Sequence, residues 1–521
     1  MTHVTPNRAR RAWQALNTEQ AQRWLVLAIF GVYLLAGLLL FDDFGASTDE
    51  VYQADKARLT LDYISGRNSD LLSYDDRHYG ALFSVLLQVA SAPFEDSRAG
   101  MLARHLATFL FFSGGVVLFY HMARRLGHGR MLALAGSALL ALHPQIFGHS
   151  FFNPKDIPFL TMYILALLSL AAFCQQPRWQ NALLHGIASG VLVVFRLPGV
   201  TLWATTAVLL LWLLLRRSVT LRQALALGSL YLAAALASLV LFLPALWHNP
   251  LGELLTFFSM QPFSWTSQEL LAGTFYPLEQ IPWYHLPLYF GVTTPLPLLL
   301  ILGVSWALLA VQAIRRQLAL PGVVALAALS VAVGVLAITQ PRVYNGWRHV
   351  FFVWPLMVLV MLEGLRWLAA RARQDWQKQT LALALTALLG WLVWVNASLH
   401  PYQYAYYNLL AGQPNNAPRQ NYIMDYWGLT YREAFEWIAA NDSRPVIYVS
   451  AESVIPAAQN LAMLPAEDRA RIHLQEIHVG VKDDYYISNF KETLGLKRPN
   501  AKLLTTISRD NTVLAAIYRP R

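Results

Sequence analysis

Eleven apolar stretches, each near the length that crosses a bilayer, constrain this sequence more than any other feature. The hydrocarbon core is about 30 Å thick, so a spanning helix needs roughly 20 apolar residues. Hydrophobic residues make up 56% of the chain and charged residues only 13%, which excludes a single soluble globule. We therefore expect an all-α polytopic membrane protein embedded in a lipid bilayer. The predicted spans are 24–41, 102–121, 131–147, 157–174, 181–196, 199–215, 223–246, 293–313, 321–339, 350–368 and 380–397.

One pair of predicted spans carries an alternative. Arg196, Leu197, Pro198 and Gly199 interrupt a 35-residue apolar stretch between 181 and 215. Two short spans or one bent element would both fit this pattern. The choice decides whether the number of crossings is odd or even.

The distribution of charge predicts the orientation. The net charge of +10 would suit nucleic acid binding, but the basic residues lie at the ends of apolar stretches, so we expect no nucleic acid partner. One set of alternate loops holds 17 Lys and Arg residues, whereas the short loops of the other set hold 4. The positive-inside tendency then places the N-terminus in the cytoplasm. With eleven spans, the C-terminus lies outside.

Three segments are too polar to be embedded in lipid: 42–100, 247–292 and the tail 398–521. The tail contains β-branched stretches at 445–450 and 513–518 and helix-like stretches at 454–463 and 467–472, which predicts a small C-terminal α/β extramembrane domain. We divide the chain into a transmembrane module, 1–397, and this domain. Loop 247–292 is rich in aromatic residues, Phe263 and Trp265 among them, which suits either an interfacial belt or a wall for a lipid chain.

Two acidic residues follow the first span closely. Asp49 and Glu50 come within nine residues of its end, on the side predicted to be outside. A carboxylate held at a membrane surface can act as a general base, because partial burial orients it and raises its pKa. The alternative is that these are ordinary solvated loop acids.

Several cations lie at the outward ends of spans, where the positive-inside tendency depletes them. Lys155 and Asp156 abut the fourth span, and Arg348 opens the tenth. A phosphate ligand would explain these cations, because Arg presents a planar donor fork to phosphate. The alternative is pairing with the eleven acids of loop 42–100.

An Asp-Glu pair after the first span, an outward loop along the membrane, and Arg348 opening a late span that contains Pro355 resemble the GT-C membrane glycosyltransferases. The resemblance is strongest to the protein O-mannosyltransferase and aminoarabinose transferase branch. It implies an inverting transfer of a sugar from a polyprenyl monophosphate donor to a periplasmic acceptor protein or glycolipid. It also implies a location in the bacterial inner membrane, with the C-terminus periplasmic.

The resemblance also implies roles for residues. Asp49 matches the family's base, and Glu50 matches a neighbouring acid that positions sugar or acceptor, or simply forms a salt bridge. Asp156 resembles a second-loop acid that binds a metal or the acceptor. Cations fixed beside the departing phosphate would contribute most in the transition state. The candidates are Arg348 first, then Arg77, His78, Lys155 and Arg196.

Cofactors and competing functions stay open at this point. With one cysteine, Cys174, a cysteine-based zinc site is excluded, whereas Asp49 with Asp156 could hold a divalent ion. The monophosphate-donor branches mostly work without a metal. A transporter is one alternative function, although the sequence has no inverted repeat. A glycan ligase or polymerase that uses a polyprenyl diphosphate donor is the other.

Overall fold

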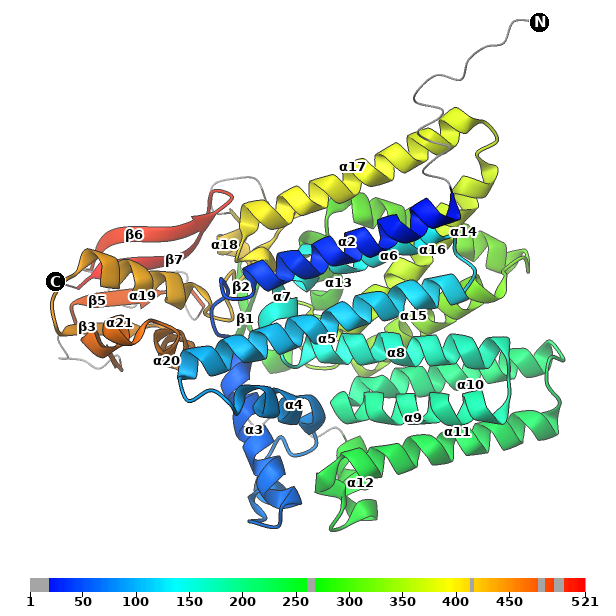
Figure 1. Cartoon of the computed structure of the whole chain (residues 1–521), viewed down its shortest axis with the longest axis horizontal. Helices are drawn as coiled ribbons and strands as arrows, with labels where there is room; N and C mark the ends of the chain where they lie inside the picture. The colour runs from blue at the N-terminus through cyan, green and yellow to red at the C-terminus, as the bar shows by residue number, and fades with distance from the viewer. Residues whose placement is uncertain (1–17, 260–267, 413–416, 477–482, 492–500, 521) are drawn as a thin grey trace, which may run out of the picture.

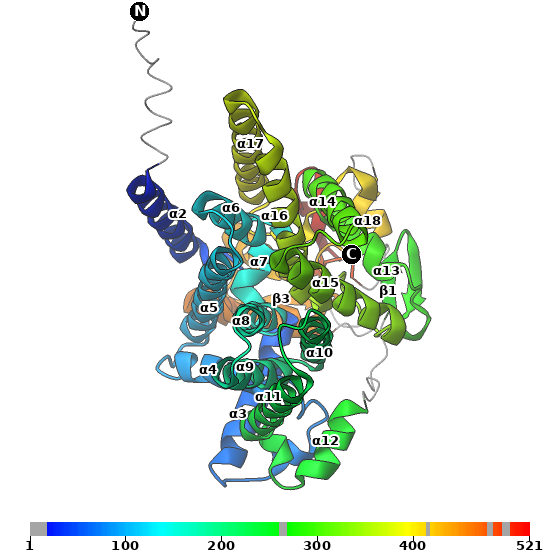
Figure 2. The same ribbon diagram turned by 90° about the vertical axis from the view of Figure 1, so that its right-hand side faces the viewer.

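The structure, a computed structural model, describes residues 18–259, 268–412, 417–476, 483–491 and 501–520, so Phe263 and Trp265 lie outside it. Its long helices run side by side in one bundle (Figures 1 and 2). Every predicted span corresponds to helix. The helices are α2 (Glu19–Leu40), α5 (Ser97–Arg125), α6 (Arg130–Ala141), α7 (Pro144–Phe152), α8 (Asp156–Gln175), α9 (Trp179–Phe195), α10 (Val200–Leu215), α11 (Leu221–Phe242), α14 (Leu296–Ile314), α15 (Leu320–Thr339), α16 (Trp354–Arg371) and α17 (Asp375–Leu399).

Two of the predicted spans differ from straight full-length helices. Nine helices of the described residues are long and apolar enough to cross a membrane, or ten if α6 and α7 form one broken span. These two helices meet at a 67° bend, because Pro144 lacks the N–H that a continuous helix needs and disfavours helical backbone at His143. Helix α9 has 17 residues, which at 1.5 Å per residue is about 25 Å, slightly less than the hydrocarbon thickness.

Helices α9 and α10 are two separate elements, which decides between the alternatives for residues 181–215. Arg196 ends α9 with an extended backbone, at φ −161° and ψ 141°, and the 3-10 turn η2 (Leu197–Gly199) leads into α10. The two helices lie side by side in both views (Figures 1 and 2). The reversal places the Arg196 side chain at the end of the bundle.

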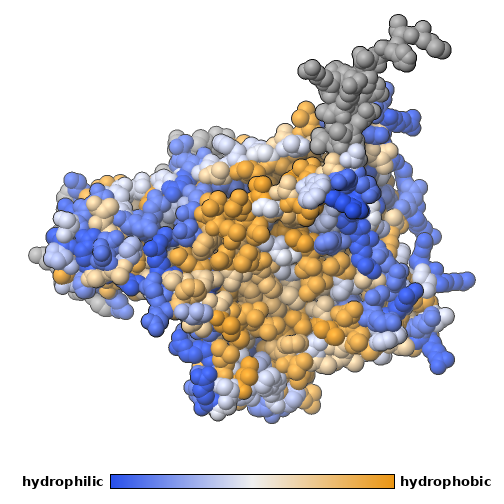
Figure 3. Space-filling model, in the orientation of Figure 1, coloured by the Kyte–Doolittle hydropathy of each residue, from blue (hydrophilic) through white to orange (hydrophobic). Residues whose placement is uncertain are grey.

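The polar segments gather mainly at one end of the bundle, together with the C-terminal domain (Figure 1). An apolar band separates this end from the opposite polar end (Figure 3). The connecting elements are η1 (Asp70–Ser73), η3 (Pro244–Leu246), η4 (Leu278–Gln280), η6 (Gln403–Ala405), η7 (Leu409–Ala411), α3 (Thr48–Ile64), α4 (Ala81–Ser91), α12 (Pro250–Phe258), α13 (His285–Thr293), α18 (Ala417–Asn421) and the hairpin of β1 (Gln268–Leu271) with β2 (Thr274–Pro277).

This arrangement makes the predicted topology testable. We fuse reporter enzymes after residue 521. A reporter that works only outside the cytoplasm is expected to be active there, and one that works only in the cytoplasm is expected to be inactive, because the charge bias places the opposite end of the bundle inside. A reporter in the loop after α14 is the matched control and is expected to show the opposite pattern. Cytoplasmic activity of the C-terminal fusion would contradict an odd number of crossings.

The C-terminal domain is a mixed sheet with helices, as the tail predicts. Its five strands have the order β4-β3-β5-β7-β6, with β3 parallel to β4 and β5, and β7 antiparallel to β5 and β6. Sequence reasoning found β3, β7 and both short helices but not the other three strands. The elements are α19 (Thr430–Asn441), β3 (Ile447–Ala451), α20 (Val454–Ala462), α21 (Ala466–Arg471), β4 (Ile472–Gln475), β5 (Tyr485–Ser488), β6 (Lys502–Arg509) and β7 (Thr512–Arg519).

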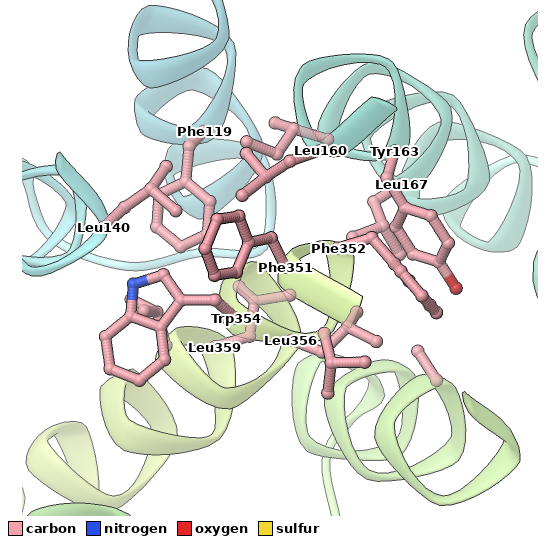
Figure 4. Close-up of a cluster of buried hydrophobic side chains, with 14 of the residues drawn as sticks. Phe119, Leu140, Leu160, Tyr163, Leu167, Phe351, Phe352, Trp354, Leu356 and Leu359 are labelled. Carbon is pink, nitrogen blue, oxygen red and sulfur yellow. The ribbon is translucent and has the colours of Figure 1, made fainter. Parts of the chain in front are cut away.

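The bundle core fixes the segment that enters α16. This segment, η5 (Arg348–Val353), is buried along its whole length. Phe351 and Phe352 pack among side chains of α5, α6 and α8 (Figure 4), and the Phe352 ring lies 5.0 Å from that of Tyr163. Aromatic contacts of this kind allow little movement, so the core holds the adjacent Arg348 in place.

Candidate active site

The first turn of α3 presents the two predicted acids differently. Ser47 donates its backbone N–H to Glu50 Oε2 at 2.7 Å, and Glu50 Oε1 lies 3.0 Å from His105 Nε2 of α5. Glu50 is therefore buried, with one carboxylate oxygen bonded within the turn and the other in contact with the bundle. The Asp49 side chain is 16% exposed. Of the two, Asp49 is the carboxylate that is accessible from outside the protein.

Asp156 is held at the start of α8. The Asn153 side chain accepts the Asp156 backbone N–H at 2.8 Å and donates its own amide to Asp156 Oδ2 at 3.0 Å. This local turn satisfies backbone groups that the start of a helix leaves unpaired. Asp156 itself is 1% exposed, so its carboxylate points into the protein.

Two arginines from distant parts of the chain meet these carboxylates. Arg348 Nη1 donates to Asp49 Oδ2 at 3.1 Å and to Asp156 Oδ2 at 2.9 Å, while Arg196 Nη1 donates to Asp156 Oδ1. Arg196 Nη2 also lies 3.1 Å from His349 Nδ1. Both arginines are buried. The predicted pairing with first-loop acids thus holds for Arg348 through Asp49, and the anionic ligand stays a prediction.

The C-terminal segment covers this cluster with an aromatic ring. The Arg348 guanidinium lies 4.5 Å from the ring centre of Trp427 and 5.1 Å from that of Tyr344. Trp427 donates its indole N–H to His149 Nε2 at 3.0 Å, and His149 Nδ1 lies 2.6 Å from the Gln145 carbonyl oxygen. Because Nε2 accepts the indole proton, His149 carries its own proton on Nδ1. The position of Trp427 above Arg348 is therefore fixed.

A second group of cations lies beside the first. The Nζ atoms of Lys155 and Lys56 lie 5.4 and 6.0 Å from the centre of the Tyr79 ring. Both lysines line a small cavity with Phe195, the residue before Arg196. Neither lysine makes an ion pair within the part of the chain that the structure describes. Burial, with the charge of Lys155 next in importance, lowers the pKa of Lys56 to about 7.

Arg77 and His78 contact a different partner. Arg77 Nε lies 3.2 Å and His78 Nε2 2.5 Å from Glu253 Oε2 of α12. Burial lowers the pKa of His78, and the Glu253 carboxylate opposes this effect. The structure thus brings Lys155, Arg196 and Arg348 together with Asp49 and Asp156, and it binds Arg77 and His78 to α12.

The described residues contain no group of three or more His, Cys, Asp or Glu side chains placed to hold a metal ion. Asp49 and Asp156 share Arg348 as their neighbour, so a cation already occupies the space between their Oδ2 atoms. The arrangement suits an anionic ligand near the arginines better than a metal ion between the acids.

Lys56 is the site residue that sequence reasoning missed. It lies seven residues after Asp49, which is two turns along one face of α3. The buried face of this helix carries Glu50, Gln53, Lys56 and Thr60, polar residues at helical spacing. A polar stripe at intervals of three and four was the signal available in the sequence. It was not used because charged residues in a loop normally face solvent.

Comparisons with known proteins agree with this architecture. The family model of the dolichyl-phosphate-mannose-protein mannosyltransferases matches residues 95–248, less than a third of the chain. This range includes Asp156 and Arg196 but not Asp49 or Arg348. A search of curated proteins finds no match.

Two crystal structures of ArnT from Cupriavidus metallidurans have a similar fold. The apo structure aligns with a TM-score of 0.52 at 16% identity, and the structure bound to undecaprenyl phosphate with 0.51 at 15%. Each alignment covers 96% of this chain and 98% of ArnT. The family model and the fold confirm the resemblance stated from the sequence: this chain is a membrane protein with the fold of the GT-C glycosyltransferases.

Proposed function

We propose that the protein is an inverting glycosyltransferase that moves a sugar from a polyprenyl monophosphate donor to an acceptor outside the cytoplasm. One observation carries the proposal: a partly exposed carboxylate, Asp49, lies at the edge of a buried cluster of cations, at the end of the bundle that carries the C-terminal domain. Inverting transfer needs a base for the acceptor and, on the other side of the sugar, stabilisation of a departing phosphate.

Asp49 is the better candidate for the base. Asp156 accepts from Arg196, Arg348 and Asn153 and is buried, so an acceptor cannot reach its carboxylate. Asp49 accepts one side-chain hydrogen bond, from Arg348, which orients its carboxylate. In the proposed step the acceptor oxygen or nitrogen gives its proton to Asp49 and bonds to the anomeric carbon. The bond from this carbon to the phosphate oxygen breaks, and the lipid phosphate keeps the electron pair.

The cations suit the leaving group. Negative charge grows on the phosphate as the glycosidic bond breaks, so fixed cations contribute more in the transition state than in the ground state. Lys56 and Lys155 line the cavity next to Arg196 and have no carboxylate partner among the described residues. ArnT bound to undecaprenyl phosphate, although only its fold is shared, supports a ligand of this class. Arg196 and Arg348 then link the phosphate site to Asp156 and Asp49.

A direct assay tests the reaction. Purified protein in lipid nanodiscs is given polyprenyl monophosphate donors that carry radiolabelled hexoses or pentoses, with polyprenyl diphosphate sugars as parallel donors. Acceptors are membrane glycolipids and periplasmic protein. We expect label to move to the acceptor with release of equimolar polyprenyl monophosphate. Transfer from the diphosphate donors alone would contradict the proposal in favour of a ligase or polymerase.

Lys56 gives a test of the phosphate site that does not depend on turnover. Lys56→Met is expected to weaken binding of undecaprenyl phosphate by about ten- to a hundredfold, the usual value of a hydrogen bond to a charged group. Between pH 7 and 9 the affinity of the wild type should fall, because Lys56, with its pKa of about 7, loses its proton while the phosphate is already dianionic. Lys56→Arg stays charged, so its affinity should remain level over this range.

Lys56→Met is expected to weaken phosphate binding but to raise the stability of the folded protein. Because the pKa of Lys56 is lower in the folded protein than its ordinary 10.5, the unfolded state binds this proton more tightly. Stability is therefore lost as the pH falls from 10.5 towards 7. Lys56→Met should unfold at a higher temperature than the wild type at pH 7, and the difference should shrink above pH 10. A Lys56→Met protein that is less stable and binds phosphate normally would remove Lys56 from the site.

A further inference from the structure

The segment that leads from α2 to α3, residues 41–47, is held by the C-terminal domain. Arg432 of α19 donates to the carbonyl oxygens of Asp42 and Phe44, the latter at 3.0 Å. Residues 41–47 belong to no helix or strand, and the N–H groups of Phe41 and Asp43 bond back to carbonyl oxygens at the end of α2, at 3.1 and 3.2 Å. The carbonyl oxygens of Asp42 and Phe44 are instead satisfied by a part of the chain almost 400 residues away.

Asn460 of α20 makes the most extensive of these contacts. Its side chain accepts the Ala46 N–H at 2.9 Å and donates to the carbonyl oxygens of Ala46 at 2.9 Å and Gly428 at 3.0 Å. Asn460 is fully buried. A Cβ at Gly45 would lie 2.5 Å from Asn460 Oδ1, so this close approach requires glycine. The amide therefore clamps the backbone immediately before α3.

Two further contacts reach the first turn of α3 itself. With its amide nitrogen towards Ser47, Gln459 donates to the Ser47 carbonyl oxygen at 2.7 Å and accepts the Val51 N–H at 3.2 Å. Thr48 Oγ1 donates to the carbonyl oxygen of Trp427 at 3.3 Å. Asp49 lies between Ser47 and Val51, whose backbone groups bond to Gln459. On its other side the same turn is held by the bundle, through the contact of Glu50 with His105.

We propose that the C-terminal domain is a working part of the catalytic site, and that Gln459 and Asn460 are positioning residues for Asp49. This inference rests on the proposed function of Asp49 as the base. The 3.1 Å bond from Arg348 orients the Asp49 side chain, while the clamp on one side and the contact of Glu50 with His105 on the other fix the backbone that carries it. Misplacement of a reacting group by about 1 Å can cost about a hundredfold in rate. In this role the domain holds the backbone that carries Asp49 in position and does not contact the substrate.

Gln459→Met and Asn460→Ala test the proposal. Methionine keeps the volume of Gln459 and removes both hydrogen bonds, so its effect reports the clamp and not a cavity. We expect kcat to fall by about ten- to a hundredfold in each variant. The KM for the donor and the affinity for undecaprenyl phosphate should stay within about twofold. Lys56 lies two turns beyond Asp49 on α3, and the helix between them is also held by α4, where Ser84 Oγ donates to Gln53 at 2.7 Å.

Arg469→Ala is the matched control. Arg469 also joins the domain to the bundle, by donating to Ser97 Oγ of α5 at 3.0 Å, but it does not contact residues 41–51. Its removal should leave kcat unchanged. Thermal unfolding of all three variants shows whether any of them is globally destabilised.

Hydrogen–deuterium exchange separates this inference from the proposed function. Gln459→Met and Asn460→Ala should speed exchange in residues 46–51, and Arg469→Ala should not. Faster exchange with normal kcat, or unchanged exchange, would overturn the clamp. If the wild type transfers sugar from none of the donors, the proposed function fails together with the catalytic role of the clamp. The exchange data then still decide whether α20 holds the turn.

Discussion

Asp49→Asn is expected to abolish sugar transfer while leaving the affinity for undecaprenyl phosphate within about twofold of the wild type. An amide has the size of the carboxylate and still accepts from Arg348, but it cannot take the proton of the acceptor. Loss of a general base typically costs about 10²–10⁴-fold. Turnover with labelled donor, beside equilibrium binding of undecaprenyl phosphate, measures both quantities. Near-normal turnover would exclude Asp49 as the base.

Asp156→Asn is the matched control for this experiment. Its carboxylate neutralises Arg196 and Arg348 in a buried setting, so the amide leaves two arginines with less compensating charge. Breaking a buried ion pair typically costs about 3–5 kcal/mol of stability. Asp156→Asn should therefore unfold at a clearly lower temperature than Asp49→Asn. Glu50→Gln should keep measurable transfer, since Glu50 contacts only the turn and α5 within the described chain.

The second large effect concerns Arg348. Its Nη1 atom donates to both Asp49 and Asp156, and its planar group lies against Trp427 and Tyr344. Arg348→Ala removes these contacts and is expected to cost about 3–5 kcal/mol of stability, because two carboxylates lose a buried partner. Arg348→Lys keeps the charge but not the fork or the stacking, so it should fold and still lose most of its turnover.

Thermal unfolding beside a turnover assay on both variants distinguishes structure from catalysis. A destabilised Arg348→Ala protein with a fully active Arg348→Lys counterpart would show that Arg348 serves only to pair the acids. Lys56, Lys155 and Arg196 would then remain as the residues that bind the phosphate. A stable Arg348→Ala protein would contradict the ion pairs described here.

Much of the fold follows from the sequence because a bilayer imposes a length and a composition on each spanning helix. The break at Pro144 was not predicted, although the reason for it is local. The strands β4, β5 and β6 were missed because short strands depend on partners that only the folded domain supplies.

The site was predicted in part. Polar residues at the outward ends of different spans share one face of the membrane, and the structure brings Asp156, Arg196 and Arg348 into contact. Which of them form pairs depends on long-range geometry. Arg77 could not be assigned to Glu253, since 176 residues separate them. The position of Trp427 could not be predicted, because nothing local indicates that a residue of the tail covers Arg348.

The origin of this cover in the last quarter of the chain has a consequence for biosynthesis. Thr48 and Trp427 are in contact across 379 positions of sequence. At about 5–20 residues per second, a ribosome needs roughly 20–75 s to bridge that interval. During this time α3 has already been made, but the C-terminal residues that clamp it do not yet exist. If Asp49 is the base, as proposed, the nascent protein is expected to reach its full rate of transfer only once the last domain has folded.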